Sequence, residues 1–270
     1  MNYDTYIDLI SEERYEEATA YKSSCIPDVL YKYFWLDDDE KKNEMRLSTL
    51  ERGEIYLSTL DQFNDPFEGK AFVFEEDDSS KGPSKAICED FIKQINSHAR
   101  ICCFSNSDEK HQNMPMWAYY ANNHRGFCVE YRIVDRQKKF IYPVSYDPIR
   151  VKGNHFIGRL IMGIYQMAVE GKDSSEMSGE ISAYNHMAYL SLTCKHVSWR
   201  HEKEFRALVP TEYGMFFPAV PSKIYVGMNC IKEHTDRLLS IANKFVGCEV
   251  YKMQEIIDNT DFCLKEEKIY

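Results

Sequence analysis

Apolar residues recur along the chain at two spacings, one typical of helices and one typical of strands. The helical spacing of three and four residues is clearest in His155–Val169, where one stripe is formed by Ile157, Leu160, Ile161, Ile164 and Ala168. Strict alternation is clearest in Gly126–Ile133, where Phe127 and every second residue after it is apolar or aromatic. The two patterns interleave from one end of the chain to the other, which predicts an α+β fold.

The same two criteria assign most of the remaining chain. Helices are expected over 7–22, 41–52, 84–95 and 116–122, between 179 and about 193, and between 228 and 248. Strands are expected over 30–36, 54–60, 100–105, 140–146, 204–209, 223–228 and 248–253, with 140–146 as the antiparallel partner of 126–133. We predict a helical extension over 1–29 and a single domain over 30–270. This domain would have mixed, mainly antiparallel central sheets flanked by helices, and a helical insertion at about 150–195.

Composition narrows the class of protein. A chain of 270 residues with 44% hydrophobic residues can bury a sizeable core, and its net charge of -10 disfavours a protein that binds nucleic acid over its whole surface. The basic stretch 132–139 leaves a smaller nucleic-acid site open, although the end of a solvated hairpin explains it equally well. The acidic start MNYDTYIDLISEE does not resemble a secretory signal, and no apolar run approaches the roughly 18–20 residues of a membrane helix. We therefore predict a cytoplasmic protein without a membrane anchor.

The cysteines and the common motifs exclude several chemistries. The nine cysteines show no CxxC spacing, which predicts reduced thiols in the core and no metal site. The sequence also lacks GxGxxG after a strand, GxxxxGK[ST], HExxH and GxSxG. These absences exclude the easily recognised dinucleotide folds, P-loop enzymes, zincins and hydrolases.

A first segment that could carry chemistry is Leu57–Glu68. It places Ser58 and Thr59 at a strand end and Asn64 and Asp65 in the turn that follows. Functional residues are often held on such loops by a rigid strand. The alternative is that Asn64 and Asp65 only shape the turn before Pro66.

A second segment is Met116–Phe127, which is rich in aromatic residues. On a helix, the rings of Trp117 and Tyr120 could close over a planar ligand, with Gly126 allowing close approach of the backbone. The alternative is a helix that simply packs Trp117 onto the sheet.

A third segment is Lys195–Arg206. Glu202, Glu204 and Arg206 are expected on one face of a strand, where two close carboxylates raise the pKa of one of them and Arg206 can form an ion pair with the other. Such a pair suits general-base or charge-stabilising chemistry. The alternative is an exposed, charged strand face.

These segments, in this order, resemble a bacterial family catalogued as domain of unknown function 2971. The resemblance rests on LYKYF at 30–34, FNDPFE at 63–68, CFS at 103–105, MWAYYANNHRGFCVEY at 116–131, WRHEKEFR at 199–206 and KIYVGMN at 223–229. It spans about residues 30–265, and the family name implies no activity.

A second resemblance implies an activity. NAD-dependent ADP-ribosyltransferases have an early strand with Arg or His, then an S-T-S or Tyr motif, and a late Glu, often within E-x-E. Ser58–Thr59 and Glu202–Glu204 are similar to the second and third elements, in the same order. The first element differs, because YKY at 31–33 stands where Arg or His is expected, which leaves Lys32 or Arg46 to anchor the nicotinamide ribose.

This resemblance implies that NAD, as substrate, lies across the strand ends with its nicotinamide ring between aromatic side chains. Ser58 or Thr59 would position the late glutamate. Glu204, or Glu202 in its place, would bond the ribose 2'-hydroxyl and stabilise the positive charge that develops as nicotinamide departs. The other glutamate would orient or deprotonate the acceptor. The candidate NAD-binding residues are Tyr31, Lys32, Ser58, Thr59, Asn64, Asp65, Trp117, Tyr120 and Arg206.

The acceptor stays open between protein, RNA and DNA. By analogy, a bacterial transferase of this kind would be a toxin or phage-defence effector, with an antitoxin or other inhibitory protein as a partner. Two alternatives are a non-enzymatic binding or regulatory module of the same fold, and a nuclease or other nucleic-acid-processing enzyme. In the first alternative, the residues of the three segments are structural.

Overall fold

One long sheet forms the framework of the protein. The computed structural model describes residues 1–12, 14–76, 83–106, 113–171, 190–257, 260 and 262–270. Within them, eight strands lie in the order β14 (Leu264–Lys268), β13 (Glu249–Glu255), β12 (Pro221–Val226), β5 (Phe127–Arg132), β1 (Val29–Phe34), β4 (Ala99–Ser105), β10 (Glu204–Pro210) and β6 (Ile141–Pro143). Neighbours are antiparallel except β12 and β13, which confirms the predicted α+β class with a mixed, mainly antiparallel sheet.

The two faces of this sheet differ. Helices α3 (Glu40–Glu51) and α10 (Lys232–Ala242) cover one face, where Leu47 and Leu238 join the main hydrophobic core. Helix α5 (Met114–Tyr120) and the 3-10 helix η3 (Val197–Glu202) lie on the other face, which carries the polar side chains described below. Strand β5 supplies both faces by alternation, as its sequence predicts, with Val129 in the main core and Cys128 under α5.

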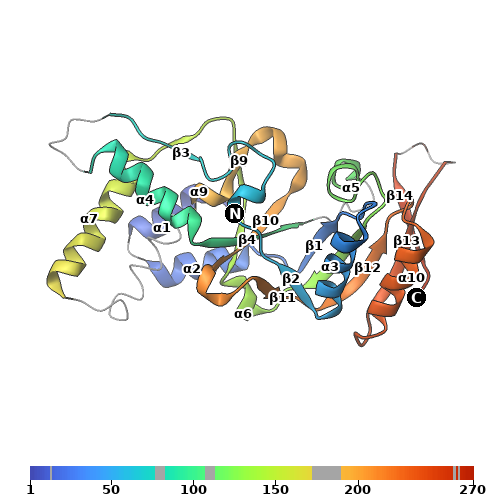
Figure 1. Ribbon diagram of the computed structural model, residues 1–270. Coiled ribbons are helices and arrows are strands. Elements are labelled where there is room, and N and C mark those ends of the chain that lie inside the picture. The colour runs from blue at the N-terminus through green and yellow to red at the C-terminus, as the bar shows by residue number, and fades with distance from the viewer. Residues whose placement is uncertain (13, 77–82, 107–112, 172–189, 258–259, 261) are drawn as a thin grey trace.

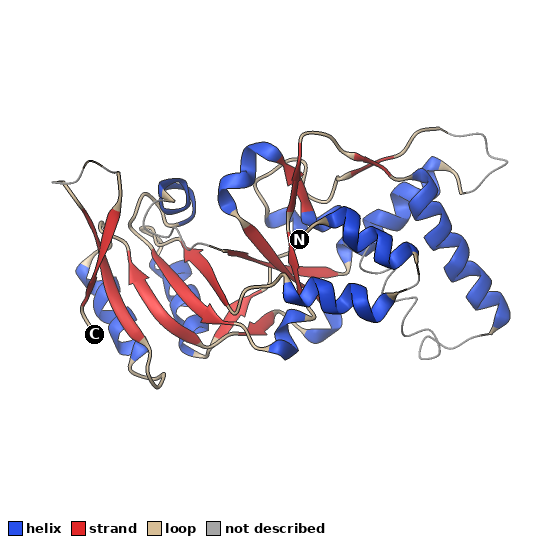
Figure 2. Cartoon of the chain, turned by 180° about the vertical axis from the view of Figure 1, so that it is seen from behind, coloured by secondary structure: helices blue, strands red, loops and turns tan. Residues whose placement is uncertain are grey.

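The ends of the molecule are built differently (Figures 1 and 2). At one end, α4 (Lys85–Ser97) packs against α7 (Asn154–Glu170), with α9 (Leu190–Thr193) beside α4; at the other lie α10, β13 and β14. The helix expected over 155–169 is confirmed, but only the first half of its apolar stripe is buried, since Ile157 is inaccessible and Ile164 is exposed. The expected break at 171–179 and the helix after it fall almost wholly outside the described residues. Within the part that is described, no helix has the length and apolar character needed to cross a bilayer.

The region after β5 departs from the sequence prediction. Residues 140–146 do not pair with β5, because β5 already lies between β1 and β12. Helix α6 (Asp135–Lys138) occupies the expected hairpin end and carries the chain to β6 at the edge of the sheet, beside β10. The remaining pairs are short: β2 (Glu54–Tyr56) with β11 (Phe216–Pro218), β3 (Phe72–Val73) with β8 (Val151–Lys152), and β7 (Ser145–Asp147) with β9 (Cys194–His196).

The N-terminal extension is a helical hairpin. Instead of one helix over 7–22, the chain forms α1 (Tyr3–Ser11) and α2 (Tyr15–Ser24). Tyr6 and Ile10 of α1 bury their side chains against Ala18 of α2, which a single straight helix could not achieve. The break thus lets two weakly amphipathic segments cover each other's apolar faces.

Lys22 fastens this hairpin to the sheet region. Its side chain is inaccessible to solvent, and its ammonium group donates hydrogen bonds to the backbone carbonyls of Lys138, Lys139 and Ile141 at 3.2, 2.8 and 3.2 Å. The same group lies 3.9 Å from the centre of the Tyr142 ring. Burial disfavours the charged form and lowers the pKa of Lys22 to about 7.

The contribution of Lys22 to stability is therefore expected to depend on pH. Between pH 7 and the unfolded pKa of about 10.4, the unfolded chain keeps a proton that the folded protein has lost, so the free energy of unfolding rises with pH. The slope is at most about 1.4 kcal/mol per pH unit. Urea unfolding of the parent and Lys22→Met at pH 7, 8 and 9 measures it, with exposed Lys41→Met as the control. Equal slopes in the parent and Lys22→Met would contradict the assignment.

Candidate active site

Three neighbouring strands bring candidate residues together on the polar face of the sheet. Ser105 of β4 stands opposite Tyr31 of β1 and opposite Glu204 of β10. Directly opposite residues of an antiparallel pair point to the same face, so these three side chains form one row. Arg206 and Cys103 form the next row. Glu204 on β10 and Tyr31 on β1 are therefore separated by one strand, β4.

Glu202 reaches the same place from the end of η3. Lys203, between the two glutamates, has a left-handed backbone with φ of 45°, which turns the chain from η3 into β10. The hydroxyl of Ser105 donates a hydrogen bond to the backbone carbonyl of Glu202 at 2.6 Å. Ser58 or Thr59 is expected from the sequence to position the late glutamate. In this structure Ser105 makes that contact. Ser58 instead pairs through its backbone with Ile101.

Two cations hold three carboxylates in a buried network. The guanidinium of Arg206 donates two hydrogen bonds to Glu68, each of 2.7 Å, and one of 2.7 Å to Glu204. The ammonium of Lys195 donates to Glu202 at 2.6 Å and to Glu204 at 3.0 Å. None of these five side chains is more than 5% exposed. The interpretation of this segment as an exposed charged strand is therefore wrong, and the expected ion pair of Arg206 is confirmed.

The charges in this network do not cancel. Three carboxylates and two cations leave one excess negative charge when every group is ionised. Burial alone would raise the pKa of Glu204, but attraction to Arg206 and Lys195 outweighs burial and holds that pKa well below its usual range. Burial, together with the negative charge of Glu204, raises the pKa of Glu202. Glu202 is therefore the carboxylate that can take up a proton and neutralise the network.

Tyr120 connects helix α5 to this network. Its hydroxyl donates a hydrogen bond to Oε1 of Glu202, and burial, with the nearby carboxylate, raises its pKa far above the ordinary tyrosine value. The hydroxyl of Tyr146 accepts a hydrogen bond from the backbone N–H of Glu204 at 2.8 Å. Both tyrosines therefore stay neutral, and Glu202 keeps a neutral partner on one oxygen and a cation on the other.

Trp117, by contrast, is a core residue. It is 0% exposed, its ring stacks on His124 with centroids 5.7 Å apart, and it meets Tyr33 edge-on at 5.2 Å. A ring that is covered on all sides cannot stack on nicotinamide, so its assignment to NAD binding is wrong. Gly126 likewise serves the fold, because a Cβ atom there would lie 2.0 Å from the backbone oxygen of Phe34.

Lys195, Glu202 and Glu204 of the network line a small pocket that adjoins a larger cleft. The pocket has a volume of about 90 Å³ and is lined by residues that include Tyr31, Asn64, Lys195, Glu202 and Glu204. The cleft has a volume of about 840 Å³, within the range of ligand sites. Both are lined by Lys32, Tyr33 and Tyr120, so the cleft lies next to the pocket that contains the carboxylates.

The lining of the cleft is cationic and aromatic. It includes Lys32, Lys42, Arg46 and Arg52, and no Asp or Glu among the described residues that line it. Lys32 and Arg46 form no ion pair within the described part of the chain, whereas Lys42 pairs with Asp39 and Arg52 with Glu54. Its rings are those of Tyr33, Phe34, Trp35, Tyr56, Tyr119, Tyr120 and Phe216, and Ser58 lies in the same wall. Although the whole chain has a net charge of -10, this cleft brings cations and aromatic rings together. Its lining therefore suits an anionic ligand with flat rings.

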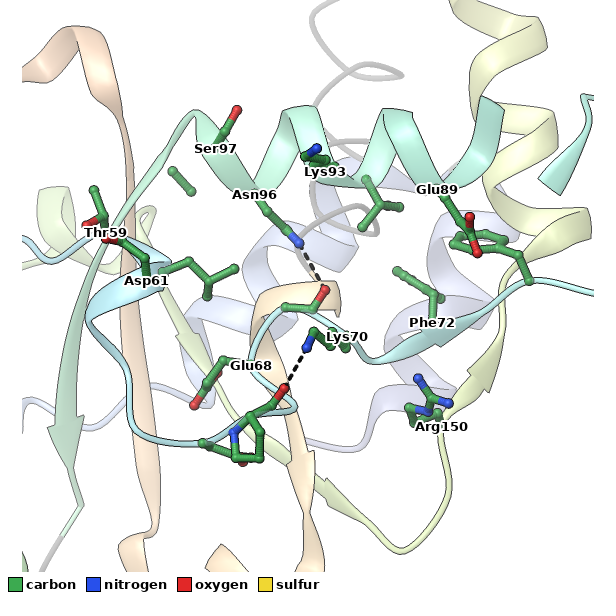
Figure 3. Close-up of a pocket in the computed structure, with 17 residues that line it drawn as sticks. Thr59, Asp61, Glu68, Lys70, Phe72, Glu89, Lys93, Asn96, Ser97 and Arg150 are labelled. Atoms are coloured by element: carbon green, nitrogen blue, oxygen red, sulfur yellow. Dashed lines mark hydrogen bonds between the residues drawn. The ribbon is translucent and has the colours of Figure 1, made fainter. Parts of the chain in front are cut away.

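A separate cavity of about 760 Å³ lies between the 59–70 segment and helix α4 (Figure 3). Two of its polar side chains have partners within the protein: Asn96 donates to the carbonyl of Gly69, and Lys70 to that of Pro66, each at 2.9 Å. Thr59 and Asp65 line this cavity rather than the pocket, and the Asp65 carboxylate accepts a hydrogen bond from the N–H of Phe67 at 2.9 Å. Asp65 is thus a turn residue, as the alternative interpretation had it.

The structure therefore sorts the candidate residues into three groups. Those that line the pocket or the cleft are Tyr31, Lys32, Ser58, Asn64, Tyr120, Glu202 and Glu204. Arg206 holds two carboxylates from behind and is fully buried, while Thr59, Asp65 and Trp117 lie outside the pocket. Sequence reasoning did not single out Glu68, Ser105 or Lys195, although each belongs to a segment it quoted.

Two other kinds of site among the described residues would be a metal centre and a reactive thiol. No group of three or more His, Cys, Asp or Glu side chains there is placed to hold a metal ion. Each of the nine cysteines is a free thiol, and burial raises the pKa of Cys103, the one nearest the carboxylates. A neutral thiol is a poor nucleophile.

Residues 116–207 match the model of a family described as "Protein of unknown function (DUF2971)". This match confirms the resemblance to that family over the segment that carries Tyr120, Lys195, Glu202, Glu204 and Arg206. No curated protein and no solved structure matches the chain. The family description gives no activity, so a function has to be argued from the site.

Proposed function

We propose that this chain, which carries a DUF2971 region at 116–207, is an ADP-ribosyltransferase that uses NAD as substrate and modifies a macromolecular acceptor. One observation supports the proposal above all: a cationic, aromatic cleft adjoins a pocket that is lined by two carboxylates. These carboxylates, of Glu202 and Glu204, belong to a network of three carboxylates and two cations. NAD has the complementary polarity, with two phosphates in its middle and a positively charged nicotinamide ring at one end.

The side chains of the cleft suit the outer part of NAD. Lys32, whose ammonium also donates to the carbonyl of Cys103 at 3.1 Å, and Arg46 are the cations of the cleft that have no carboxylate partner in the described residues. They would contact the pyrophosphate, Arg46 with two parallel hydrogen bonds. Tyr56 and Phe216 meet edge-on at 6.1 Å and offer apolar surface to the adenine ring. These contacts would leave the nicotinamide ribose at the pocket, above Glu202.

The carboxylates suit the chemical step. Breaking the bond between the ribose and nicotinamide leaves positive charge on the ribose carbon, while nicotinamide departs neutral with the bonding electron pair. Ionised Glu202, with Glu204 behind it, would stabilise that charge in a site that excludes water. As the acceptor atom bonds to the ribose carbon, its proton would pass to Glu202. Lys195 and Tyr120 would hold Glu202 in place.

Unregulated modification of macromolecules at the expense of NAD would damage the cell that makes the enzyme. We therefore also propose a cytoplasmic toxin or phage-defence role and an inhibitory partner such as an antitoxin. This part of the proposal rests on analogy with other transferases of this kind.

Titration calorimetry with NAD tests the binding part of the proposal. The parent protein is expected to bind NAD, and Arg46→Gln is expected to bind it about 10- to 140-fold more weakly, because a hydrogen bond to a charged group contributes about 1.5–3 kcal/mol. Lys41→Gln is the matched control, since Lys41 lies on the same helix but does not line the cleft. Absence of NAD binding by the parent, or equal affinity in Arg46→Gln, would remove the proposal.

A further inference from the structure

A second cleft adjoins the pocket that contains the carboxylates. We call it the aromatic cleft; its volume is about 400 Å³, and its lining is Asn64, Tyr119, Ser198, Trp199 and His201. The ring centroids of Tyr119 and His201 are 6.4 Å apart, and those of His201 and Trp199 are 6.2 Å apart. Tyr119 is 61% exposed. Three rings from α5 and η3 thus form one aromatic surface beside the pocket.

The aromatic cleft adjoins the reacting groups. Asn64 lines both this cleft and the pocket that contains Glu202. The ammonium of Lys195 lies 5.1 Å from the centre of the Trp199 ring and 2.6 Å from Oε2 of Glu202. Lys195 therefore connects the Trp199 wall of the aromatic cleft to the carboxylate of Glu202.

Two side-chain groups of the aromatic cleft, Nε2 of His201 and the amide of Asn64, have no hydrogen-bond partner in the described part of the chain. Nε2 of His201 is buried and makes no hydrogen bond, although Nδ1 lies 3.2 Å from the backbone oxygen of Ser198. The side-chain amide of Asn64 also makes no hydrogen bond there and offers both a donor and an acceptor. The Asn64 side chain is exposed in the cleft, so its amide can form hydrogen bonds with the edge of a bound ring.

The lining also limits the chemistry of the ligand. It contains no Lys, Arg, Asp or Glu, so nothing in it pairs with a charged Arg, Glu or Asp side chain of a protein acceptor. A neutral, flat ring with hydrogen-bonding edges fits it, and aromatic surfaces bind every nucleobase by stacking.

We propose that the aromatic cleft binds a nucleobase and that this base is the acceptor of ADP-ribose. The binding part stands by itself, whereas the transfer rests on the proposed function. In the transfer, a ring or exocyclic atom of the base bonds to the ribose carbon as the bond to nicotinamide breaks. Nicotinamide leaves with the electron pair of that bond, and the proton of the base passes to Glu202.

Binding is measured by fluorescence anisotropy, without NAD, using labelled single-stranded DNA and RNA homopolymers of each base, with free nucleosides as competitors. Tyr119→Ala and Trp199→Ala are each expected to weaken binding about 5- to 140-fold, because stacking of one base contributes about 1–3 kcal/mol. Trp199→Phe keeps a ring and should retain most of the affinity. Tyr165→Ala is the matched control, because Tyr165 is 65% exposed and lies on α7.

The outcomes separate this inference from the proposed function. Nucleobase binding that depends on Tyr119 and Trp199 supports the aromatic cleft as a base site, whether or not the protein binds NAD. Absence of NAD binding would overturn the transfer and the proposed function. Release of nicotinamide from NAD, together with failure of every base-bearing probe to bind, overturns the inference and leaves the proposed function standing. Equal affinity in the parent, Tyr119→Ala and Trp199→Ala also overturns it. Competition by nucleosides alone would identify a free nucleoside as the acceptor, and competition by strands alone a base within a strand.

Discussion

Arg206→Met is expected to lower the free energy of unfolding by about 3–5 kcal/mol, the usual cost of removing one partner from a buried ion pair. Methionine fills much of the space but leaves Glu68, Glu202 and Glu204 with Lys195 as their single cationic partner. Two uncompensated negative charges would then lie in a region that is at most 5% exposed. Urea unfolding followed by circular dichroism measures the loss.

The matched control is Arg237→Met on helix α10. Arg237 also pairs with two carboxylates, Glu44 and Glu51, at 2.9 and 2.8 Å, but its side chain is 27% exposed. Water can hydrate the carboxylates that lose this partner, so the expected loss is below about 1 kcal/mol. Arg206→Met that unfolds like Arg237→Met would show that the network around Arg206 is hydrated and does not carry a buried charge.

The elements that could be predicted from the sequence are those in which one pattern runs unbroken. β1, β5, β10 and α3 lie where the alternation and the helical spacing place them, and Gly53 follows α3 in the left-handed conformation with φ of 70°. The errors concern partners rather than periods. The 140–146 segment is extended in part, but nothing local shows that it pairs with β10 and not with β5.

The site shows the same division. Glu202, Glu204 and Arg206 lie close along the chain, and their shared face follows from the period of a strand. Glu68 is 138 residues from Arg206, so the hydrogen bonds between them depend on the fold and not on local spacing. Ser105 is a similar case, because its contact with Glu202 depends on the register of β4 and β10. Trp117 could not be assigned from the sequence, since a core ring and a ligand-stacking ring have the same local pattern.

The exposure of a charged segment is likewise a property of the fold. Lys195, Glu202, Glu204 and Arg206 would be hydrated on an isolated strand, and their composition gives no sign of burial. Helix α5 brings Tyr120 over them, and β7 brings Tyr146. Burial then separates the pKa values of Glu202 and Glu204, which identical side chains two residues apart would not otherwise show.

Glu202→Gln is expected to slow the release of nicotinamide from NAD on the order of 10²–10³-fold, the usual cost of removing one group that stabilises transition-state charge. The substitution removes the carboxylate charge but keeps its shape, and the amide oxygen can still accept a hydrogen bond from Lys195. Because burial and the charge of Glu204 raise the pKa of Glu202, a neutral group costs less at Glu202 than at Glu204, and the stability of Glu202→Gln should stay close to that of the parent. Single-turnover measurement of nicotinamide by chromatography gives the rate.

Glu204→Gln and the pH dependence provide the controls for this prediction. Glu204 is held ionised by Arg206 and Lys195, so its amide variant should lose stability as well as activity. In the parent, the rate should rise with pH as Glu202 ionises, with a midpoint above the ordinary glutamate range because its pKa is raised. In Glu202→Gln this acidic limb should be absent. A variant that keeps the parental rate and the parental pH profile would show that Glu202 does not act on NAD. A variant that is slow and flat with pH, yet as stable as the parent, is the result that only a reacting carboxylate explains, since a structural one would lower the unfolding free energy instead.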